Sequence, residues 1–241
     1  MNVYDIIITE REKVNISDLF LDSQNSIALQ QLIKEYQYID ELSRYNLPVN
    51  NKLLLHGSSG CGKTTTAKAI ANALNRPLNI LNLSNVVQAR IGETSQNLKM
   101  VFDKVARENS ILLLDEFDQI GKMRTTDDKD VGEMRRLVNT LIQLMDYLPE
   151  KALLIAATNH LEILDKALIR RFQIVVKYEM PTNETLDNYY NKILSTMPPH
   201  LTDIERKYEI SFAEAKDYAF TRIKSLLIQE LELNQQSISV E

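Results

Sequence analysis

The sequence has few of the residues that cross-link a chain or interrupt its regular structure. Its 241 residues include one cysteine, six glycines, six prolines and no tryptophan. A single cysteine, Cys61, excludes an internal disulfide and is typical of a reducing compartment, so we expect a cytoplasmic location. No stretch is rich enough in glycine or proline to form a flexible linker.

Long apolar runs and a secretion signal are also missing. The longest strictly apolar stretch is six residues, from Ala152 to Ala157, whereas a membrane-spanning helix needs roughly 20. The N-terminus, MNVYDIIITEREK, has no basic start followed by a long apolar core and a small-residue cleavage site. We therefore expect no association with a membrane.

The charge balance is ordinary for a globular protein and slightly acidic. Charged residues make up 25% and hydrophobic residues 44% of the chain, and the formal net charge is −5. This composition supports a buried core. A net negative charge argues against a broad nucleic-acid-binding surface.

Short apolar runs alternate with amphipathic segments over most of the chain. Fully apolar strands between helices predict an α/β fold, a parallel sheet sandwiched by helices. The 78–83 strand alternates apolar residues with Asn, which predicts a half-buried strand. Strands are expected at 52–56, 78–83, 111–114, 152–158 and 172–178, and helices at 27–45, 63–74, 94–107 and 133–148.

After residue 180 the pattern changes to helices without strands. Segments 183–196 and 212–233 both read as helices, which predicts a small α-helical lid domain. The first 25 residues are expected to form a strand or linker that packs on the core. The predicted organisation is an N-terminal segment and linker helix at 1–45, an α/β core at 46–180, a helical lid at 181–235 and a tail at 236–241.

A glycine-rich segment between an apolar run and a helix indicates a phosphate site. The residues from Gly57 to Thr64 fit the P-loop pattern G-x-x-x-x-G-K-[ST], so the expected parallel sheet sandwiched by helices is of the P-loop NTPase type. A loop that folds its N–H groups around a phosphate needs residues that tolerate positive φ. Lys63 is expected on the β- and γ-phosphates of ATP, and Thr64 on Mg²⁺. The candidate cofactor-binding residues are Gly57, Ser58, Ser59, Gly60, Cys61, Gly62, Lys63, Thr64 and Thr65.

Two carboxylates follow the apolar run at 111–114, which is the form of a Walker B motif. A metal beside a triphosphate needs an acid at the carboxyl end of a strand, and Asp115 is predicted to hold Mg²⁺ through water. Glu116 is the candidate general base that polarises the attacking water. Asp118, two residues further on, is interpreted as a loop or cap residue.

With these motifs and three further segments in order, the chain resembles the AAA+ ATPases, and more narrowly their protein-remodelling AAA subfamily. The resemblance implies that the 46–180 core is the AAA+ ATPase core. Ala156-Ala-Thr-Asn159 is similar to the sensor 1 segment, which implies that Asn159 holds the attacking water. The segment from Leu164 to Phe172 is similar to the second region of homology, which implies that Arg170, Arg171 or both reach a neighbouring subunit's ATP. A guanidinium would also stabilise the charge that spreads over the γ-phosphoryl group.

The resemblance implies a ring of identical subunits, usually six, around a central pore. The segment from Ser84 to Phe102 is similar to the pore-loop region, and its pore triplet would be Arg90, Ile91 and Gly92. Relatives that thread polypeptides generally have an aromatic residue where this chain has Arg90, which puts continuous threading in doubt. Ser211-Phe-Ala213 replaces the sensor 2 arginine of many AAA+ proteins, as is common in the AAA subfamily.

Three functions remain open at this stage. The first is an ATP-driven ring that remodels or delivers a protein substrate. The second is an ATP-gated regulator or scaffold of a partner enzyme, and the third is a nucleic-acid-linked loader. The acidic charge and the type of second homology region count against the third.

Overall fold

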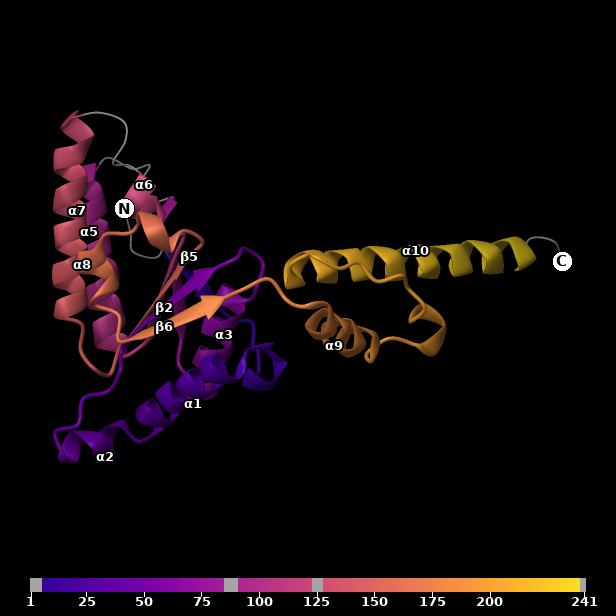
Figure 1. Ribbon diagram of the computed structural model, residues 1–241, viewed down its shortest axis with the longest axis horizontal. Helices are drawn as coiled ribbons and strands as arrows, with labels where there is room; N and C mark the ends of the chain where they lie inside the picture. Colours follow the sequence, from indigo (N-terminus) through magenta and orange to yellow (C-terminus); the bar gives the residue numbers. More distant parts are fainter. Residues whose placement is uncertain (1–5, 85–90, 123–127, 239–241) are drawn as a thin grey trace. The chain divides into compact units, whose positions relative to one another are not determined.

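The computed structural model describes residues 6–84, 91–122 and 128–238 and groups the chain into two compact units. Unit 1 comprises Met1–Gly57 and Lys63–Tyr178, and unit 2 comprises Ser58–Gly62 and Glu179–Glu241. Unit 1 is a sheet with helices on its faces, and unit 2 consists of helices, the connections between them and the Ser58–Gly62 loop (Figure 1). The predicted α/β fold is confirmed.

The sheet of unit 1 has six strands in the order β1-β3-β4-β5-β2-β6. The five strands expected from the sequence are all present and pair parallel with one another. The additional strand β1 pairs antiparallel with β3, with Ile8 opposite Ile80. The N-terminal segment thus adds an edge strand. The strands are β1 (Ile8–Glu10), β2 (Lys52–Gly57), β3 (Leu78–Asn82), β4 (Ile111–Asp115), β5 (Leu153–Thr158) and β6 (Ile174–Tyr178).

Helices cover both faces of this sheet, which explains why its central strands are uniformly apolar. On one face α5 (Ile91–Glu108) and α7 (Asp128–Asp146) share a core with alternate residues of β2, β4 and β5. On the other face α1 (Ser23–Gln37) and α3 (Lys63–Leu74) lie together, and α3 contacts β3, β4 and β5. Figure 1 shows the two helix pairs on opposite sides of the strands.

The sequence prediction is wrong in two details of unit 1. The helix expected at 27–45 is broken at Tyr38, which has φ −109° and ψ 21°, and continues as α2 (Ile39–Arg44). Asn79 in β3 is fully buried rather than at a half-exposed position. Its amide donates to Ser110 Oγ at 2.9 Å, and its oxygen accepts from Thr9 Oγ1 at 3.3 Å. A polar side chain can be buried when its hydrogen bonds are satisfied in this way.

Short elements connect the main ones. The 3₁₀ turn η4 (Leu161–Ile163) and the helix α8 (Lys166–Ile169) lie between β5 and β6, and α6 (Gln119–Lys122) follows β4. Asp165 caps α8 by accepting from Ala167 N at 2.8 Å. The 3₁₀ turn η2 (Ile16–Asp18) precedes α1. The segment that contains Arg170 and Arg171 therefore begins on a capped helical turn.

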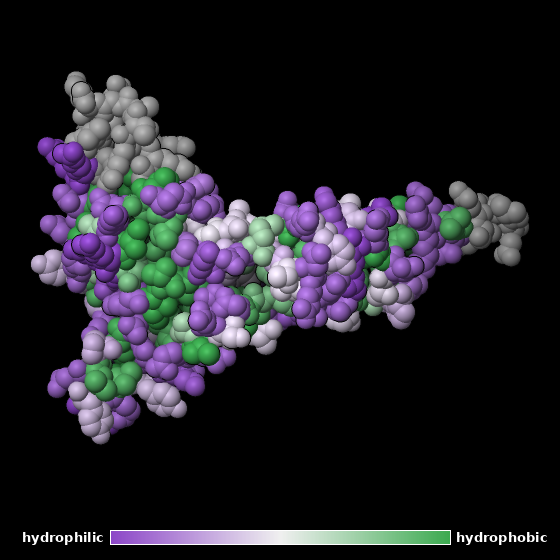
Figure 2. All heavy atoms as spheres, in the orientation of Figure 1, coloured by the Kyte–Doolittle hydropathy of each residue, from purple (hydrophilic) through white to green (hydrophobic). Residues whose placement is uncertain are grey.

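Unit 2 contains α9 (Asn183–Leu194), the turn η5 (Pro199–Leu201) and α10 (Phe212–Ile238). Two apolar clusters hold α9 against the first half of α10. The helix α10 continues to Ile238, beyond the predicted end at Leu233, because no glycine or proline stops it. Figure 2 shows hydrophobic residues among hydrophilic ones along its second half. Its exposed apolar side chains are Leu227, Ile228, Leu231 and Leu233.

No helix among the described residues is both long and apolar enough to cross a membrane.

Candidate nucleotide-binding site

The predicted phosphate loop connects strand β2, which ends at Gly57, to helix α3, which begins at Lys63. The φ angles of Gly57, Gly60 and Gly62 are +123°, +71° and +102°. These are angles that residues with a Cβ atom rarely adopt. The three glycines thus have the conformational role that the sequence pattern predicts.

Gly57 is also constrained by a neighbour. A Cβ atom at this position would lie 2.0 Å from the carbonyl oxygen of Tyr178, at the end of β6. The Tyr178 hydroxyl in turn donates to Thr66 Oγ1 of α3 at 2.6 Å, and burial raises the pKa of Tyr178. Strand β6 therefore packs tightly where the loop leaves the sheet.

Lys63 and Thr64, in the first turn of α3, lie at the carboxyl edge of the sheet. Lys63 is only 9% exposed, and its ammonium donates to the Gly57 carbonyl at 2.8 Å. Thr64 Oγ1 donates to Asp115 Oδ2 at 3.4 Å. The structure thus brings the candidate P-loop threonine and the candidate Walker B aspartate into contact, although they are far apart in sequence.

His56, the last side chain of β2 before the loop, lies among cations. Burial lowers the pKa of His56, and the nearby Lys177 and Lys63 lower it further. A neutral imidazole at this position adds no positive charge beside Lys63.

Glu116 follows Asp115 with an unusual backbone. Its φ is +53°, a left-handed conformation that is uncommon for a residue with a side chain. Its N–H donates to Asp115 Oδ1 at 2.9 Å, and its Oε2 accepts from the hydroxyl of Ser84. Such strained residues cluster at functional sites. The sequence did not indicate that Ser84, just beyond β3, would be a partner of Glu116.

Asp118 has a larger role than the loop or cap function suggested by the sequence. Its carboxylate is 2% exposed and accepts from Thr158 Oγ1 at 3.1 Å and from Asn159 N at 3.4 Å. It therefore joins the end of β5 to the segment after β4 and fixes the backbone of Asn159, whose own side chain is exposed. A third acidic residue close behind Asp115 and Glu116 was visible in the sequence. Its partners at the end of β5 could not be predicted from the sequence.

The two candidate arginines have different surroundings. Arg171 forms an ion pair with Asp146 at the end of α7, with Nε 3.3 Å from Oδ1, and donates through Nη1 to the Ala167 carbonyl at 3.0 Å. Arg170 is exposed, and its side chain has no partner among the described residues. Both lie in unit 1, directly after α8.

The other predicted site residues lie partly outside what the structure describes. Ser58, Ser59, Gly60, Cys61 and Gly62 group with unit 2. Cys61 is buried, with its Sγ 3.8 Å from Met180 Sδ. Thr65 is an exposed residue in the first turn of α3. Of the pore triplet, Arg90 lies outside the described residues, and Ile91 and Gly92 begin α5.

This fold and the geometry of its phosphate loop define a P-loop nucleotide-binding protein. The family model "ATPase family associated with various cellular activities (AAA)" matches residues 53–180, more than half of the chain. The chain belongs to the AAA family of ATPases, whose common domain is an ATP-hydrolysing module.

Individual relatives agree with this assignment. The chain is 31% identical to the uncharacterized AAA family ATPase y4kL of Sinorhizobium fredii, over 89% of this chain and 66% of that protein. It is 28% identical to a proteasome-activating nucleotidase of Sulfurisphaera tokodaii, over 91% of this chain and 57% of that protein. The chain thus spans less than two thirds of these relatives.

A solved structure confirms the fold alone. The crystal structure of the FIGL-1 AAA domain matches with a TM-score of 0.65 and 20% identity, covering 83% of this chain and 67% of that one.

Proposed function

We propose that this chain binds ATP with Mg²⁺ at the carboxyl ends of β2, β4 and β5 and hydrolyses it. The observation that carries the proposal is the 3.4 Å contact between Thr64 Oγ1 and Asp115 Oδ2, beside Lys63. A hydroxyl, a carboxylate and an ammonium at the mouth of a glycine loop match a metal-bound triphosphate.

The donor set fits Mg²⁺. This ion prefers oxygen ligands, keeps several waters and is usually held by one or two protein groups plus substrate phosphates. Thr64 and Asp115 supply two oxygens, and no group of three or more His, Cys, Asp or Glu side chains gathers among the described residues. The bound ion would neutralise charge on the β- and γ-phosphates.

Around the γ-phosphate we assign three further roles. Glu116 accepts a proton from the attacking water, since its carboxylate follows the β4 strand end directly. Asn159 orients that water, and Asp118 holds the Asn159 backbone in place. Ser84 holds the Glu116 carboxylate through its hydroxyl.

Arg170 is the better candidate for a residue that reaches a second copy of the chain. Arg171 is held within its own chain by Asp146 and the Ala167 carbonyl, whereas Arg170 is exposed without a described partner. A guanidinium that must reach another molecule's phosphate has to be free to extend. We therefore assign Arg170 as the arginine finger and Arg171 as the residue that braces its turn.

The whole assembly is proposed to be a ring, with six as the expected number of subunits, that remodels or delivers a protein substrate. AAA proteins generally form such rings, and relatives named proteasome-activating nucleotidases support a protein as the substrate. We place this activity in the cytoplasm.

Hydrolysis is tested by Glu116→Gln and Lys63→Ala. Glu116→Gln should still bind ATP but lose at least about 100-fold in turnover, because the general base is gone. Lys63→Ala should lose binding itself. Phosphate release and binding of a fluorescent ATP analogue measure the two effects in magnesium buffer. Unchanged turnover in Glu116→Gln would remove the general base from the proposal.

A further inference from the structure

The first turn of α10 packs directly on the tip of the phosphate loop, inside unit 2. The Ala213 N–H donates to the Gly60 carbonyl at 3.1 Å. A Cβ atom on Gly60 would lie 2.5 Å from Ser211 Oγ and 3.2 Å from Ala213 Cβ. The loop and the lid helix thus touch through backbone atoms, at a position where only glycine fits.

Ser211 and Glu214 fix this turn by binding each other. Glu214 Oε2 accepts from Ser211 N at 2.8 Å and from Ser211 Oγ at 2.7 Å, and Glu214 N donates to Ser211 Oγ at 3.3 Å. This reciprocal pattern is a capping box, the S-x-x-E arrangement that closes a helix N-terminus. Ser211 is 4% exposed, so its side chain is enclosed by the contact with the loop.

The capping box determines where the Ala213 N–H points. The first N–H groups of a helix have no partner within the helix and need one elsewhere. Here the box satisfies the N–H groups of Ser211 and Glu214, and the Ala213 N–H between them bonds to Gly60. Without the box the first turn could fray, and the Gly60 carbonyl would lose its donor.

We propose that Ser211 and Glu214 are positioning residues for nucleotide binding, which act by holding the Ala213 N–H on the Gly60 carbonyl and so keep the phosphate loop in its binding shape. This rests on the proposed ATP site. The two residues work through the backbone of the loop, so they slow nucleotide release without touching a phosphate.

The test measures release of ADP carrying a methylanthraniloyl fluorophore in magnesium buffer, by stopped flow against excess ADP. Ser211→Ala and Glu214→Ala should each release it about three- to tenfold faster, the range that corresponds to loss of an N-terminal cap. The KM for ATP should rise with little change in kcat. Glu214→Gln should restore slow release, because glutamine also completes a capping box.

Matched controls lie further along the same helix. Ser225→Ala and Glu232→Gln change the same residue types at exposed positions of α10, and they should leave release unchanged. Melting temperature is recorded for each variant to separate general destabilisation from the effect on the loop.

The outcomes separate this inference from the proposed function. No binding of the fluorescent ADP by the wild-type chain would overturn both. Binding by the wild type with unchanged release in Ser211→Ala and Glu214→Ala overturns the positioning role alone, even if their melting temperatures fall. Equally fast release in Glu214→Gln and Glu214→Ala also overturns it.

Discussion

Single residues at the carboxyl edge of the sheet show how buried polar groups position exposed ones. Asp118 is enclosed and Asn159 is exposed, yet one hydrogen bond joins the Asp118 carboxylate to the Asn159 backbone. A buried carboxylate with its hydrogen bonds satisfied is rigid, and removing it leaves its donors unpaired. The backbone position of the exposed Asn159 therefore depends on the buried Asp118.

Asp118→Ala should therefore reduce both stability and turnover. Loss of the acceptor for Thr158 Oγ1 and Asn159 N should lower the free energy of unfolding by about 1–3 kcal/mol. Turnover should fall about tenfold, because Asn159 loses its fixed backbone. Urea unfolding and phosphate release measure the two. Asp203→Ala, at an exposed position, is the control, and equal effects of both variants would contradict the assignment.

At the opposite end of the strands, Glu10 of β1 predicts a pH dependence. Its ion pair with Lys68, 2.8 Å away, and an N–H bond from Glu12 lower the pKa of Glu10 from 4.5 to about 2. A carboxylate with a depressed pKa stabilises the fold above its unfolded value of 4.5, and this contribution is lost as pH falls from 4.5 towards 2.

Glu10→Gln should cost up to about 1 kcal/mol in unfolding free energy at pH 7, the size of a surface ion pair. The difference in unfolding free energy between Glu10→Gln and the wild type should become smaller as pH falls below 4.5. Urea unfolding at pH 7, 4 and 3 tests this. A difference that stays constant over this range would show that the charge of Glu10 is not the cause.

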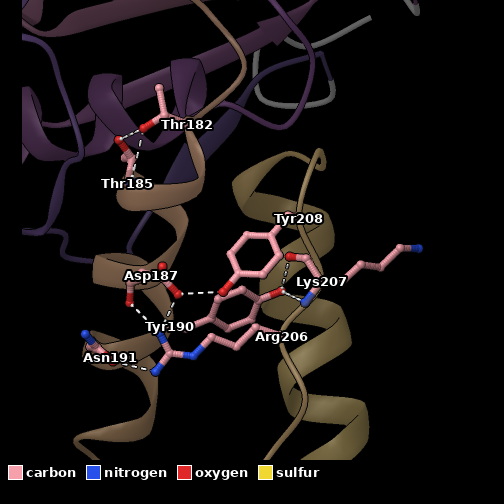
Figure 3. A network of polar contacts seen from close by, with 8 residues as sticks. All are labelled: Thr182, Thr185, Asp187, Tyr190, Asn191, Arg206, Lys207 and Tyr208. Atoms are coloured by element: carbon pink, nitrogen blue, oxygen red, sulfur yellow. Dashed lines mark hydrogen bonds and ion pairs between the residues drawn. The ribbon is translucent and has the colours of Figure 1, made fainter.

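At the scale of elements, a polar network joins the parts of unit 2 in addition to its apolar clusters. Arg206, in the segment before α10, donates to Asp187 Oδ1 and Asn191 Oδ1 of α9, both at 2.6 Å. Its guanidinium lies 5.8 Å from the Tyr190 ring, and Tyr208 donates to Asp187 at 2.8 Å. Figure 3 shows this segment joined to α9 by these contacts.

Arg206→Ala should lower the melting temperature, because the segment before α10 loses hydrogen bonds to α9. The free energy of unfolding should fall by about 1 kcal/mol, the size expected for a partly exposed arginine that also packs on an aromatic ring. Arg206→Lys should recover only part of it, since an ammonium cannot bond Asp187 and Asn191 in the same fork. Arg222→Ala on exposed α10 surface is the control, and a loss equal to that of Arg206→Ala would contradict the network's role.

The strands were predictable because their signals are local. Apolar runs such as Ile111–Asp115 specify burial on both faces, and a P-loop turn is specified by its own glycines. The break at Tyr38 has no glycine or proline to mark it. The burial of Asn79 depends on Ser110 and Thr9, which are distant in sequence.

For the whole molecule, the sequence predicted which residues belong to the candidate site but not all of the residues that hold them in place. Lys63, Thr64 and Asp115 follow from motif spacing, and the fold then places them together. Ser84 and Asp118 act through contacts between different strand ends, which no spacing encodes. The different surroundings of Arg170 and Arg171 likewise arise from the packing of α7 against α8.

The proposal that Arg170 acts on the site of a second copy predicts complementation between two inactive variants. Arg170→Ala should abolish turnover when alone while leaving ATP binding intact, and Lys63→Ala should fail to bind. Mixed together, the two should recover part of the activity, because each Arg170→Ala site can meet an intact arginine from a Lys63→Ala neighbour. Phosphate release across mixing ratios measures this.

Arg171→Ala serves as the comparison in the same assay. Since Arg171 is bound to Asp146 and Ala167, its loss should lower the melting temperature as well as turnover. If Arg170→Ala and Lys63→Ala proteins assemble with each other but their mixture recovers no phosphate release, the site is not shared between two copies.

The close approach of Gly57 to Tyr178 has a consequence for how the two units can change during evolution or design. The chain leaves the sheet after Gly57 for the loop and after Tyr178 for the helices of unit 2, and a Cβ atom on Gly57 would lie only 2.0 Å from the Tyr178 carbonyl oxygen. The extra carbon atom of an alanine at position 57 would force the ends of β2 and β6 apart. Gly57→Ala, which adds a single carbon atom, is thus expected to disturb the phosphate loop and the start of the segment that leads into unit 2 together.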